Sequence, residues 1–500
     1  MILKLVGHEY KYAVEQIMLA LFPKERPEYP SKAGATVDPI SGSGDLLAES
    51  HLRTGKTYAQ ATTVIHSDCK AFRGTARVSR VKLTDDLTAD RLLQRIIKQS
   101  FYRAALGIID TPPVWGSLTG IRPAHIAAAA FESGRTEKAV ITSLIRDYYV
   151  SPERAALCAD AAQASVWLKR TISPRDAALY IGIPFCPTRC AYCSFVSNSV
   201  EKSFALVEPF VKTLLREIEA VAKVVKELDL SIIALYVGGG TPTSLPEEAL
   251  EAIMLALSSA FDLSDLREYT FEAGRPDTIS AAKLETIRRR GAGRVCVNPQ
   301  SMSTGVLEAI GRRHTPEEVL GAVRLVREKG MALNMDIIAG LPRDTRDGFA
   351  DSLNAVMDLA PENITVHTLA LKKGSRIMLE ETRIPGGPEV AGMLGYASAC
   401  LRDGGYDPYY LYRQKYTSGG FENTGWTRPG FEGIYNICMM EELCTVLSFG
   451  GGGVTKLVSP DGGRIERVFN AKYPREYIQN TDSAEEKVKK IRAFYSGLSV

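Results

Sequence analysis

The stretch YIGIPFCPTRCAYCSF, residues 180–195, decides how this 500-residue chain is interpreted. It contains Cys186, Cys190 and Cys193 in the spacing C-x3-C-x2-C. Closely spaced cysteine thiolates of this kind hold iron–sulfur clusters. A cubane cluster has four irons, so three thiols leave one iron without a local protein ligand. By analogy with catalytic zinc sites, which keep one open position, the run predicts a [4Fe–4S] cluster that binds a cofactor or substrate.

Two other interpretations of the three cysteines stay open at this point. They could bind zinc together with a distant fourth ligand, or they could be incidental thiols. No histidine lies nearby in the sequence to complete a compact zinc site. The run also follows a β-rich segment directly, which is where barrel folds place their chemistry. These two observations favour the cluster.

The sequence around this run alternates β-rich segments with amphipathic helical patterns. The predicted strands cover residues 178–185, 232–239, 268–273, 293–300, 333–340 and 363–371. Helical patterns lie between them, at 204–228, 247–261, 279–290, 316–330 and 349–360. Strand–helix repetition of this kind demands a parallel sheet with crossover connections. We expect an α/β fold with a partial (β/α)6 TIM-like barrel, because no clear seventh and eighth units follow.

The chain divides into three predicted regions. Residues 1–173 should form an N-terminal α/β domain with a small antiparallel sheet over 56–68 and 72–83, and they carry no chemical motif. Residues 174–403 hold the partial barrel. Residues 404–500 contain an aromatic cluster, a glycine run at 448–456 and a predicted terminal helix at 483–498.

Composition narrows the class of protein and its location. The net charge is +3, from 61 basic and 58 acidic residues, which gives no general reason to expect a nucleic-acid partner. No apolar stretch reaches the roughly 18 residues that a membrane span needs. The first residues lack the features of a signal peptide, so we expect a cytoplasmic protein. Nine cysteines in a chain of this length do not make a disulfide scaffold.

The cysteine run resembles the signature of the radical S-adenosylmethionine (SAM) superfamily. More narrowly, Y-x-x-I-P-F-C-x3-C-x-Y-C is similar to the oxygen-independent coproporphyrinogen III oxidase family, also called coproporphyrinogen dehydrogenase. The segments LTGIRPAHI, residues 118–126, and PYYLYRQK, residues 408–415, look most like its HemZ branch. The resemblance implies a [4Fe–4S] cluster and SAM as cofactors. It also implies a tetrapyrrole substrate and an electron donor such as flavodoxin or ferredoxin.

The motifs that follow the cysteines match the family's SAM-binding pattern. They are GGGTPT, FEAGRP, NPQS, GRRH, NMDIIAGLP and VHTLAL. The resemblance assigns SAM contacts to Tyr180, Tyr192, Gly239, Gly240, Thr241, Glu272, Gln300, Arg312, Asp336 and Ala370. The residues alone show only that these positions lie near predicted strand ends. The glycines could instead form a tight turn, Glu272 and Asp336 could be structural, and Arg313 competes with Arg312.

The substrate is less closely defined than the cofactors. Arg413, Gln414, Lys415 and Lys456 are candidates for propionate contacts, with solvated surface charge as the alternative. Two positions depart from the family pattern, because Gly182 replaces a histidine and Phe195 replaces a fourth cysteine. The family reaction is oxidative decarboxylation of coproporphyrinogen III to protoporphyrinogen IX. The alternatives are methyl transfer, anaerobic haem breakdown, or a haem-binding chaperone using the core histidines His314 and His367.

Overall fold

The computed structural model describes residues 1–30, 46–67, 70–193, 198–371, 375–380, 382–414, 417–480 and 482–497. The chain forms two compact units, Met1–Ala159 and Asp160–Val500. Helix α5 (Pro152–Thr171) spans the boundary between them. The three regions inferred from the sequence, with boundaries at 173 and 403, stay a prediction.

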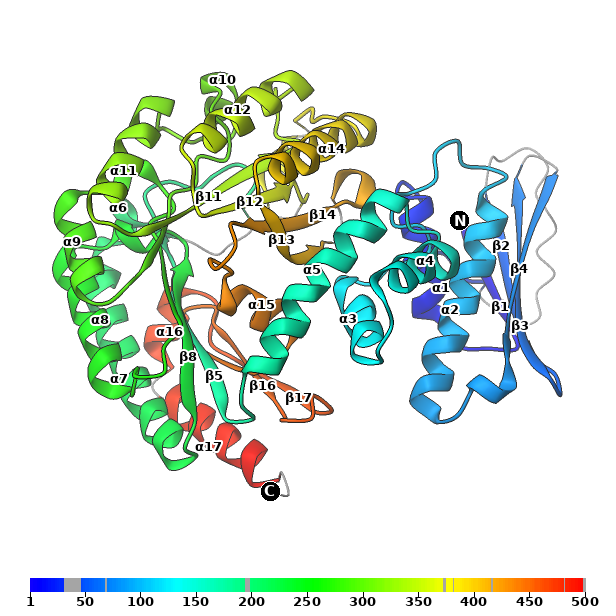
Figure 1. Ribbon diagram of the computed structural model, residues 1–500, viewed down its shortest axis with the longest axis horizontal. Helices are drawn as coiled ribbons and strands as arrows, with labels where there is room; N and C mark the ends of the chain where they lie inside the picture. Colours follow the sequence, from blue (N-terminus) through cyan, green and yellow to red (C-terminus); the bar gives the residue numbers. More distant parts are fainter. Residues whose placement is uncertain are drawn as a thin grey trace. The chain divides into compact units, whose positions relative to one another are not determined.

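The first unit is a four-stranded sheet with helices on one face (Figure 1). Its strands are β1 (Ile2–Val6), β2 (Leu47–Thr54), β3 (Tyr58–Ser67) and β4 (Lys70–Ser79). The sheet is mixed rather than purely antiparallel, because β1 precedes a helix and pairs parallel with β2. Alternate residues of β3 are buried, which gives the sheet its covered face. The helices are α1 (Lys11–Leu21), α2 (Asp86–Ala105), α3 (Ala124–Glu132) and α4 (Glu137–Tyr148).

The second unit contains an eleven-stranded sheet whose centre is the predicted barrel. The six predicted strands are present in the predicted order and run parallel. They are β5 (Asp176–Ile183), β8 (Ser231–Gly239), β9 (Glu268–Glu272), β10 (Arg294–Cys296), β11 (Ala332–Ala339) and β12 (Asn363–Thr368). The α/β partial-barrel prediction is therefore confirmed.

Helices cover the outer side of the curved sheet (Figure 1). Helix α7 buries Phe210, Leu214, Ile218 and Val221, which recur every three or four residues and so share one helix face. Thr315 and Glu318 form a capping box that starts α11. The outer helices are α7 (Val207–Glu227), α8 (Glu247–Ala260), α9 (Ala281–Arg289), α11 (Pro316–Glu328), α12 (Arg346–Asp358) and α14 (Gly387–Asp403). Short elements complete the barrel: β6 (Phe185–Cys186), β7 (Asn198–Ser199), α6 (Val200–Ser203), α10 (Thr304–Ala309) and α13 (Arg376–Leu379).

Residues 404–500 extend the same sheet at both ends. Strands β13 (Asp407–Arg413) and β14 (Glu422–Thr427) follow β12 in antiparallel pairing. At the other end β15 (Thr445–Gly450) runs parallel to β5, and β16 (Val454–Val458) and β17 (Ile465–Phe469) follow it. The sequence did not predict β15 as a further parallel strand. The remaining helices are α15 (Ile434–Glu441), α16 (Pro474–Gln479) and α17 (Ser483–Ser496), the last of which was predicted.

Among the helices of the described residues, none combines the length and the apolar character needed to cross a bilayer.

Candidate functional site

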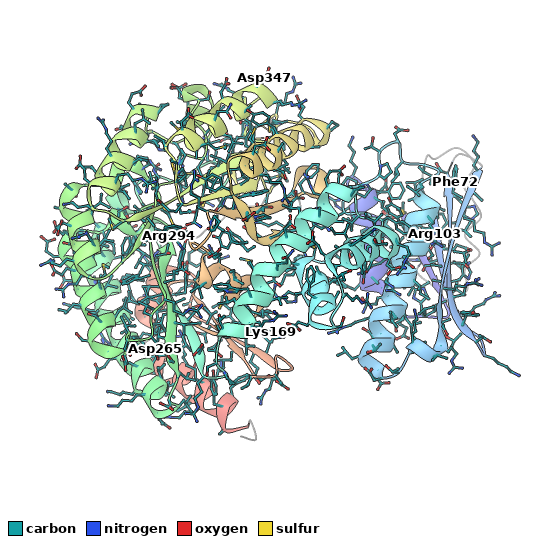
Figure 2. All side chains as sticks on the ribbon, in the orientation of Figure 1. Phe72, Arg103, Lys169, Asp265, Arg294 and Asp347 are labelled. Atoms are coloured by element: carbon teal, nitrogen blue, oxygen red, sulfur yellow. The ribbon has the colours of Figure 1, made fainter. Side chains whose placement is uncertain are left out.

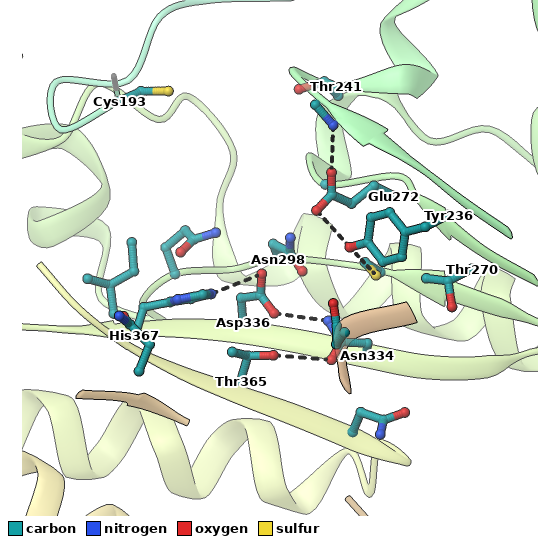
Figure 3. A pocket seen from close by; sticks show the side chains of 18 of the residues that line it. Cys193, Tyr236, Thr241, Thr270, Glu272, Asn298, Asn334, Asp336, Thr365 and His367 are labelled. Carbon is teal, nitrogen blue, oxygen red and sulfur yellow. Dashed lines mark hydrogen bonds and ion pairs between the residues drawn. The ribbon is translucent and has the colours of Figure 1, made fainter. Parts of the chain in front are cut away.

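A cavity of about 450 Å³ lies inside the barrel. Its lining includes all three cysteines of the motif and every residue predicted to contact SAM. Figure 3 shows how the side chains of several strands converge on this space, with Cys193 at one side and Glu272, Asn298 and Asp336 at the other. Residues spread over 191 positions of the chain, from Tyr180 to Ala370, therefore form one site.

The glycine motif holds the strand that carries the first cysteine. The backbone N–H of Gly240 donates to the Ile183 carbonyl at 2.7 Å, and the hydroxyl of Thr241 donates to the sulfur of Cys186 at 3.5 Å. A Cβ atom at Gly240 would lie 2.5 Å from the Phe185 carbonyl oxygen and 3.0 Å from the Cys186 sulfur. Only glycine therefore allows this approach, which gives the motif a role beyond that of a tight turn.

The other two cysteines lie on a loop that the barrel holds from two sides. The N–H of Cys193 donates to the Cys190 carbonyl at 3.2 Å. Between them, Ala191 donates to Ile310 and accepts from Ile377. Within the described ranges no three His, Cys, Asp or Glu side chains converge closely enough to hold a single metal ion. A cubane cluster does not require such convergence, because each thiolate binds a different iron.

Glu272 lies at the end of β9, and its carboxylate faces the cavity and accepts two hydrogen bonds. Its two oxygens accept from the Gly239 N–H at 3.1 Å and from the Tyr236 hydroxyl at 3.0 Å (Figure 3). Burial, reinforced by the nearby charge of Asp336, raises the pKa of Glu272 to about 7. The carboxylate is therefore costly to ionise until a ligand supplies a further donor or a positive charge.

Asp336 is another acidic group of the cavity and lies on β11, two strands away from β9 in the sheet. Asn334 donates to one of its oxygens at 2.9 Å, and the other lies 3.5 Å from the Nε2 of His367 (Figure 3). Burial favours the protonated acid, but the His367 partner outweighs it and lowers the pKa of Asp336. Asp336 is thus held as a carboxylate.

Arg312 offers the buried cation of the site. Its guanidinium donates to the carbonyls of Asn298 and Gly274 and to the Tyr192 hydroxyl, at 2.8, 3.3 and 3.2 Å. No carboxylate pairs with it, and its Nε has no hydrogen-bond partner among the described residues. The amide oxygen of Gln300, also buried, is likewise without a partner there. Buried groups left this way fit a polar, charged ligand such as the methionine end of SAM.

A wall of tyrosines closes the remaining side, and of these only Tyr180 was assigned to the site from the sequence. Tyr435 stacks on Tyr236 at 4.6 Å and on Tyr180 at 5.8 Å between ring centres. Tyr409, Tyr410 and Tyr412 continue the lining from β13. The sequence could have indicated that Tyr236 belongs to the site, because it lies directly opposite Tyr180 in the predicted parallel pair of strands. Tyr435 had no comparable signal.

The predicted substrate residues are not all brought to the cavity. Gln414 lines it and bonds the Tyr412 hydroxyl at 3.3 Å. The guanidinium of Arg413 contacts the Gly420 carbonyl, and burial lowers the pKa of Arg413 to about 10. Lys456 is not part of the lining, because its ammonium bonds the Met439 carbonyl and pairs with Glu442 at 3.3 Å. Lys415 and Phe195 lie outside the described residues.

Comparison with known proteins agrees with the site. Residues 180–356 match the model of the radical SAM superfamily. The chain is 37% identical over 388 residues to the oxygen-independent coproporphyrinogen-III oxidase-like protein HemZ of Bacillus subtilis, which covers 76% of this chain and 77% of that protein. It is 26% identical over 313 residues to the heme chaperone HemW of Haemophilus influenzae, covering 62% and 78%.

One solved structure shares the fold. The coproporphyrinogen III oxidase HemN of Escherichia coli aligns with a TM-score of 0.51 at 22% identity, covering 63% of this chain and 72% of that one.

Proposed function

We propose that this chain, which belongs to the radical SAM superfamily and within it to the family of coproporphyrinogen III oxidase-like proteins that includes HemZ, oxidatively decarboxylates propionate side chains of coproporphyrinogen III. Its cofactors are a [4Fe–4S] cluster and SAM. The observation that carries the proposal is the single cavity, which unites the cysteine motif, the buried cation and carboxylates, and an aromatic wall.

The cofactors, when bound, supply a one-electron reductive cleavage of SAM that yields a 5′-deoxyadenosyl radical. The protein's part is to bind and orient. Cys186, Cys190 and Cys193 hold the cluster, and Arg312 pairs with the SAM carboxylate. Glu272 and Asp336 accept hydrogen bonds from the ribose and ammonium groups. The tyrosine wall excludes water from the reacting end of the cavity.

The same wall supports a tetrapyrrole as substrate. Tyrosine rings present a large apolar face with a polar tip, which suits a macrocycle with polar substituents. We propose Gln414 as a contact at this end, and Arg413 and Lys415 stay candidates for binding the propionates. Lys456 is left out because it is engaged elsewhere. An electron donor such as flavodoxin or ferredoxin and a cytoplasmic location are part of the same proposal.

The experiment is an anaerobic assay of the reconstituted protein with SAM, a reductant and coproporphyrinogen III, followed by mass spectrometry. We expect loss of two carboxyl groups together with 5′-deoxyadenosine. Each of Cys186→Ala, Cys190→Ala and Cys193→Ala should abolish both products. Cys400→Ala is the matched control, because this thiol on α14 does not line the cavity. Formation of 5′-deoxyadenosine with an unchanged tetrapyrrole mass would reject this substrate and point to another radical reaction.

A haem-binding role is the second candidate, favoured by two side chains of the cavity. His367 and Met440 both line it, and either side chain can ligate haem iron. The HemW relative is itself named a heme chaperone. Titration with haem separates the two functions. Stoichiometric haem binding that is lost in His367→Ala, without decarboxylation by the wild type, would favour the chaperone.

A further inference from the structure

Glu268 lies at the first position of β9, at the end of the barrel opposite the cysteines. Its side chain is only 4% exposed. One carboxylate oxygen accepts from Arg294 at 2.9 Å and from the Thr270 hydroxyl at 2.7 Å. The other accepts from the backbone N–H of Tyr435 at 2.8 Å. This carboxylate therefore joins two barrel strands to a segment 167 residues further along the chain.

Arg294 of β10 and Asn363 of β12 hold the same segment directly. Both donate to the carbonyl of Phe431, each at 2.7 Å, and Asn363 also donates to the Thr427 hydroxyl at 3.0 Å. The side chain of Arg294 is 11% exposed, so its pairing with Glu268 is shielded from solvent. Strands β9, β10 and β12 thus fix the turn that leads into α15.

Helix α15 depends on this arrangement for its N-terminal cap. Gly433 occupies the cap position and offers no side chain, and no acidic residue lies in the first turn. The first N–H groups of a helix have no partner inside it, and a negative charge beside them is favourable. Glu268 supplies both the acceptor and the charge from another part of the fold.

The position of α15 sets one wall of the cavity. Tyr435 stacks against both Tyr180 and Tyr236, whose own ring centres lie 6.3 Å apart, and the Tyr236 hydroxyl donates to Glu272 at 3.0 Å. Tyr180 and Glu272 are proposed SAM contacts, and Figure 3 shows Tyr236 beside Glu272 at the rim of the open space. A shift of α15 would therefore reach the SAM site through two stacked rings and one hydrogen bond.

We infer that Glu268 and Arg294 are positioning residues for SAM. They lock the start of α15 so that Tyr435 holds Tyr180 and Tyr236 in place, and both members of the pair line the end of the cavity away from the cysteines. The inference rests on the SAM site of the proposed function but not on the tetrapyrrole reaction.

The test compares Glu268→Ala, Glu268→Gln and the control Glu251→Ala. Glu251 also pairs with arginines, Arg289 and Arg290, but on the outer helices. In the protein without cluster, hydrogen exchange of residues 427–441 should be about tenfold faster in Glu268→Ala, the effect of losing one charge-assisted hydrogen bond. After reconstitution, SAM should bind about tenfold more weakly, with unchanged iron content. Glu268→Gln keeps one acceptor oxygen but loses the charge, so it should recover only part of both losses.

Two results would overturn the inference. One is equal hydrogen exchange in Glu268→Ala and Glu251→Ala, which would show that Glu268 does not cap α15. The other is a SAM affinity of Glu268→Ala within about twofold of the wild type, which would show that the position of α15 does not affect SAM binding. If Glu268→Ala fails to take up iron, Tyr435→Leu decides instead, since it keeps the backbone cap and removes only the ring. Its SAM affinity should fall by a similar factor, and an unchanged affinity would refute the role of Tyr435. All these readouts are obtained without tetrapyrrole, so they stand even if the proposed substrate is wrong.

Discussion

Replacing Glu217 should destabilise this protein more than replacing any exposed carboxylate of the same helix. Glu217 of α7 pairs with Lys487 of α17, and each side chain is 2% exposed. The carboxylate also accepts from the Gly450 N–H at 2.9 Å, the Asn470 amide at 2.9 Å and the Tyr477 hydroxyl at 2.5 Å. One buried acid therefore joins α7, α16, α17 and the turn after β15.

The loss of stability in each variant depends on which buried charges and hydrogen-bonding groups it leaves without partners. Glu217→Ala leaves the Lys487 ammonium buried with the Ser448 carbonyl as its remaining hydrogen-bond acceptor among those described here. Breaking a buried pair in this way costs about 3–5 kcal/mol. Lys487→Met should cost less, because Glu217 would keep three neutral donors. Glu227 offers a matched control, since it pairs with Arg492 between the same two helices but both side chains are about half exposed. Glu227→Ala should cost only about 0–1 kcal/mol.

The assay is urea unfolding of the cluster-free protein under reducing conditions, monitored by circular dichroism. We expect the midpoints to fall in the order wild type, Glu227→Ala, Lys487→Met, Glu217→Ala, with similar m-values. Equal losses of unfolding free energy in Glu217→Ala and Glu227→Ala would refute the reasoning, because burial would then have no effect on how much the ion pair stabilises the protein. A larger loss in Lys487→Met than in Glu217→Ala would refute the argument about remaining partners.

Three further predictions concern the cavity. Gly240→Ala should abolish iron uptake during reconstitution, because its Cβ would lie 2.5 Å from the Phe185 carbonyl oxygen; normal iron content would contradict this. Arg312→Lys should weaken SAM binding about tenfold, because an ammonium group cannot make the three hydrogen bonds that the guanidinium donates in different directions. The control is Arg313→Lys, since Arg313 is exposed, and its affinity for SAM, measured by calorimetry, should be unchanged. In the ligand-free protein the pKa of Glu272 is raised from 4.5 to about 7, so its contribution to stability is present below pH 4.5 and is lost as the pH rises through 7. Above that pH, Glu272→Gln should therefore raise the free energy of unfolding by about 3 kcal/mol, and it should also weaken SAM binding. Urea unfolding at a series of pH values measures this gain. If the variant shows no gain in stability, the acid is not buried as the structure has it.

The parallel core of the fold was predictable because its signals are local. The six strands are short β-rich runs separated by five amphipathic helices, and this repetition admits few topologies. Strand β15 gave no such signal. Its partner β5 lies far back in the sequence, with Thr445 opposite Ala177, and the antiparallel strand β16, not a helix, follows it. Pairings of this kind depend on tertiary packing rather than on local pattern.

The site was predictable where chemistry and strand ends coincide. The cysteine spacing, the glycine motif and Glu272 follow that rule, whereas Asp336 lies inside β11 and was assigned from the family resemblance. His367, which was considered only as a haem ligand, and Tyr236 lie inside strands and were not assigned to SAM binding. Alternation could have placed them, because polar residues recur at every second position of the buried strands, as at 268, 270 and 272. Tyr435 could not have been placed, since it reaches the site from a helix held by Glu268.

The departure at Gly182 follows from the same long-range pairing. Gly182 lies opposite Gly450 in the β5–β15 pair, and a Cβ at Gly450 would lie 2.1 Å from the Gly182 carbonyl oxygen. A side chain at position 182 would in turn meet the Phe449 carbonyl at 3.2 Å, the Tyr180 ring at 3.3 Å and the Gly451 carbonyl at 3.4 Å. These distances leave a Cβ at position 182 only a tight fit. Gly182 therefore fits closely against the glycine turn after β15 and beside Tyr180, at the border between the SAM site and the tyrosine wall.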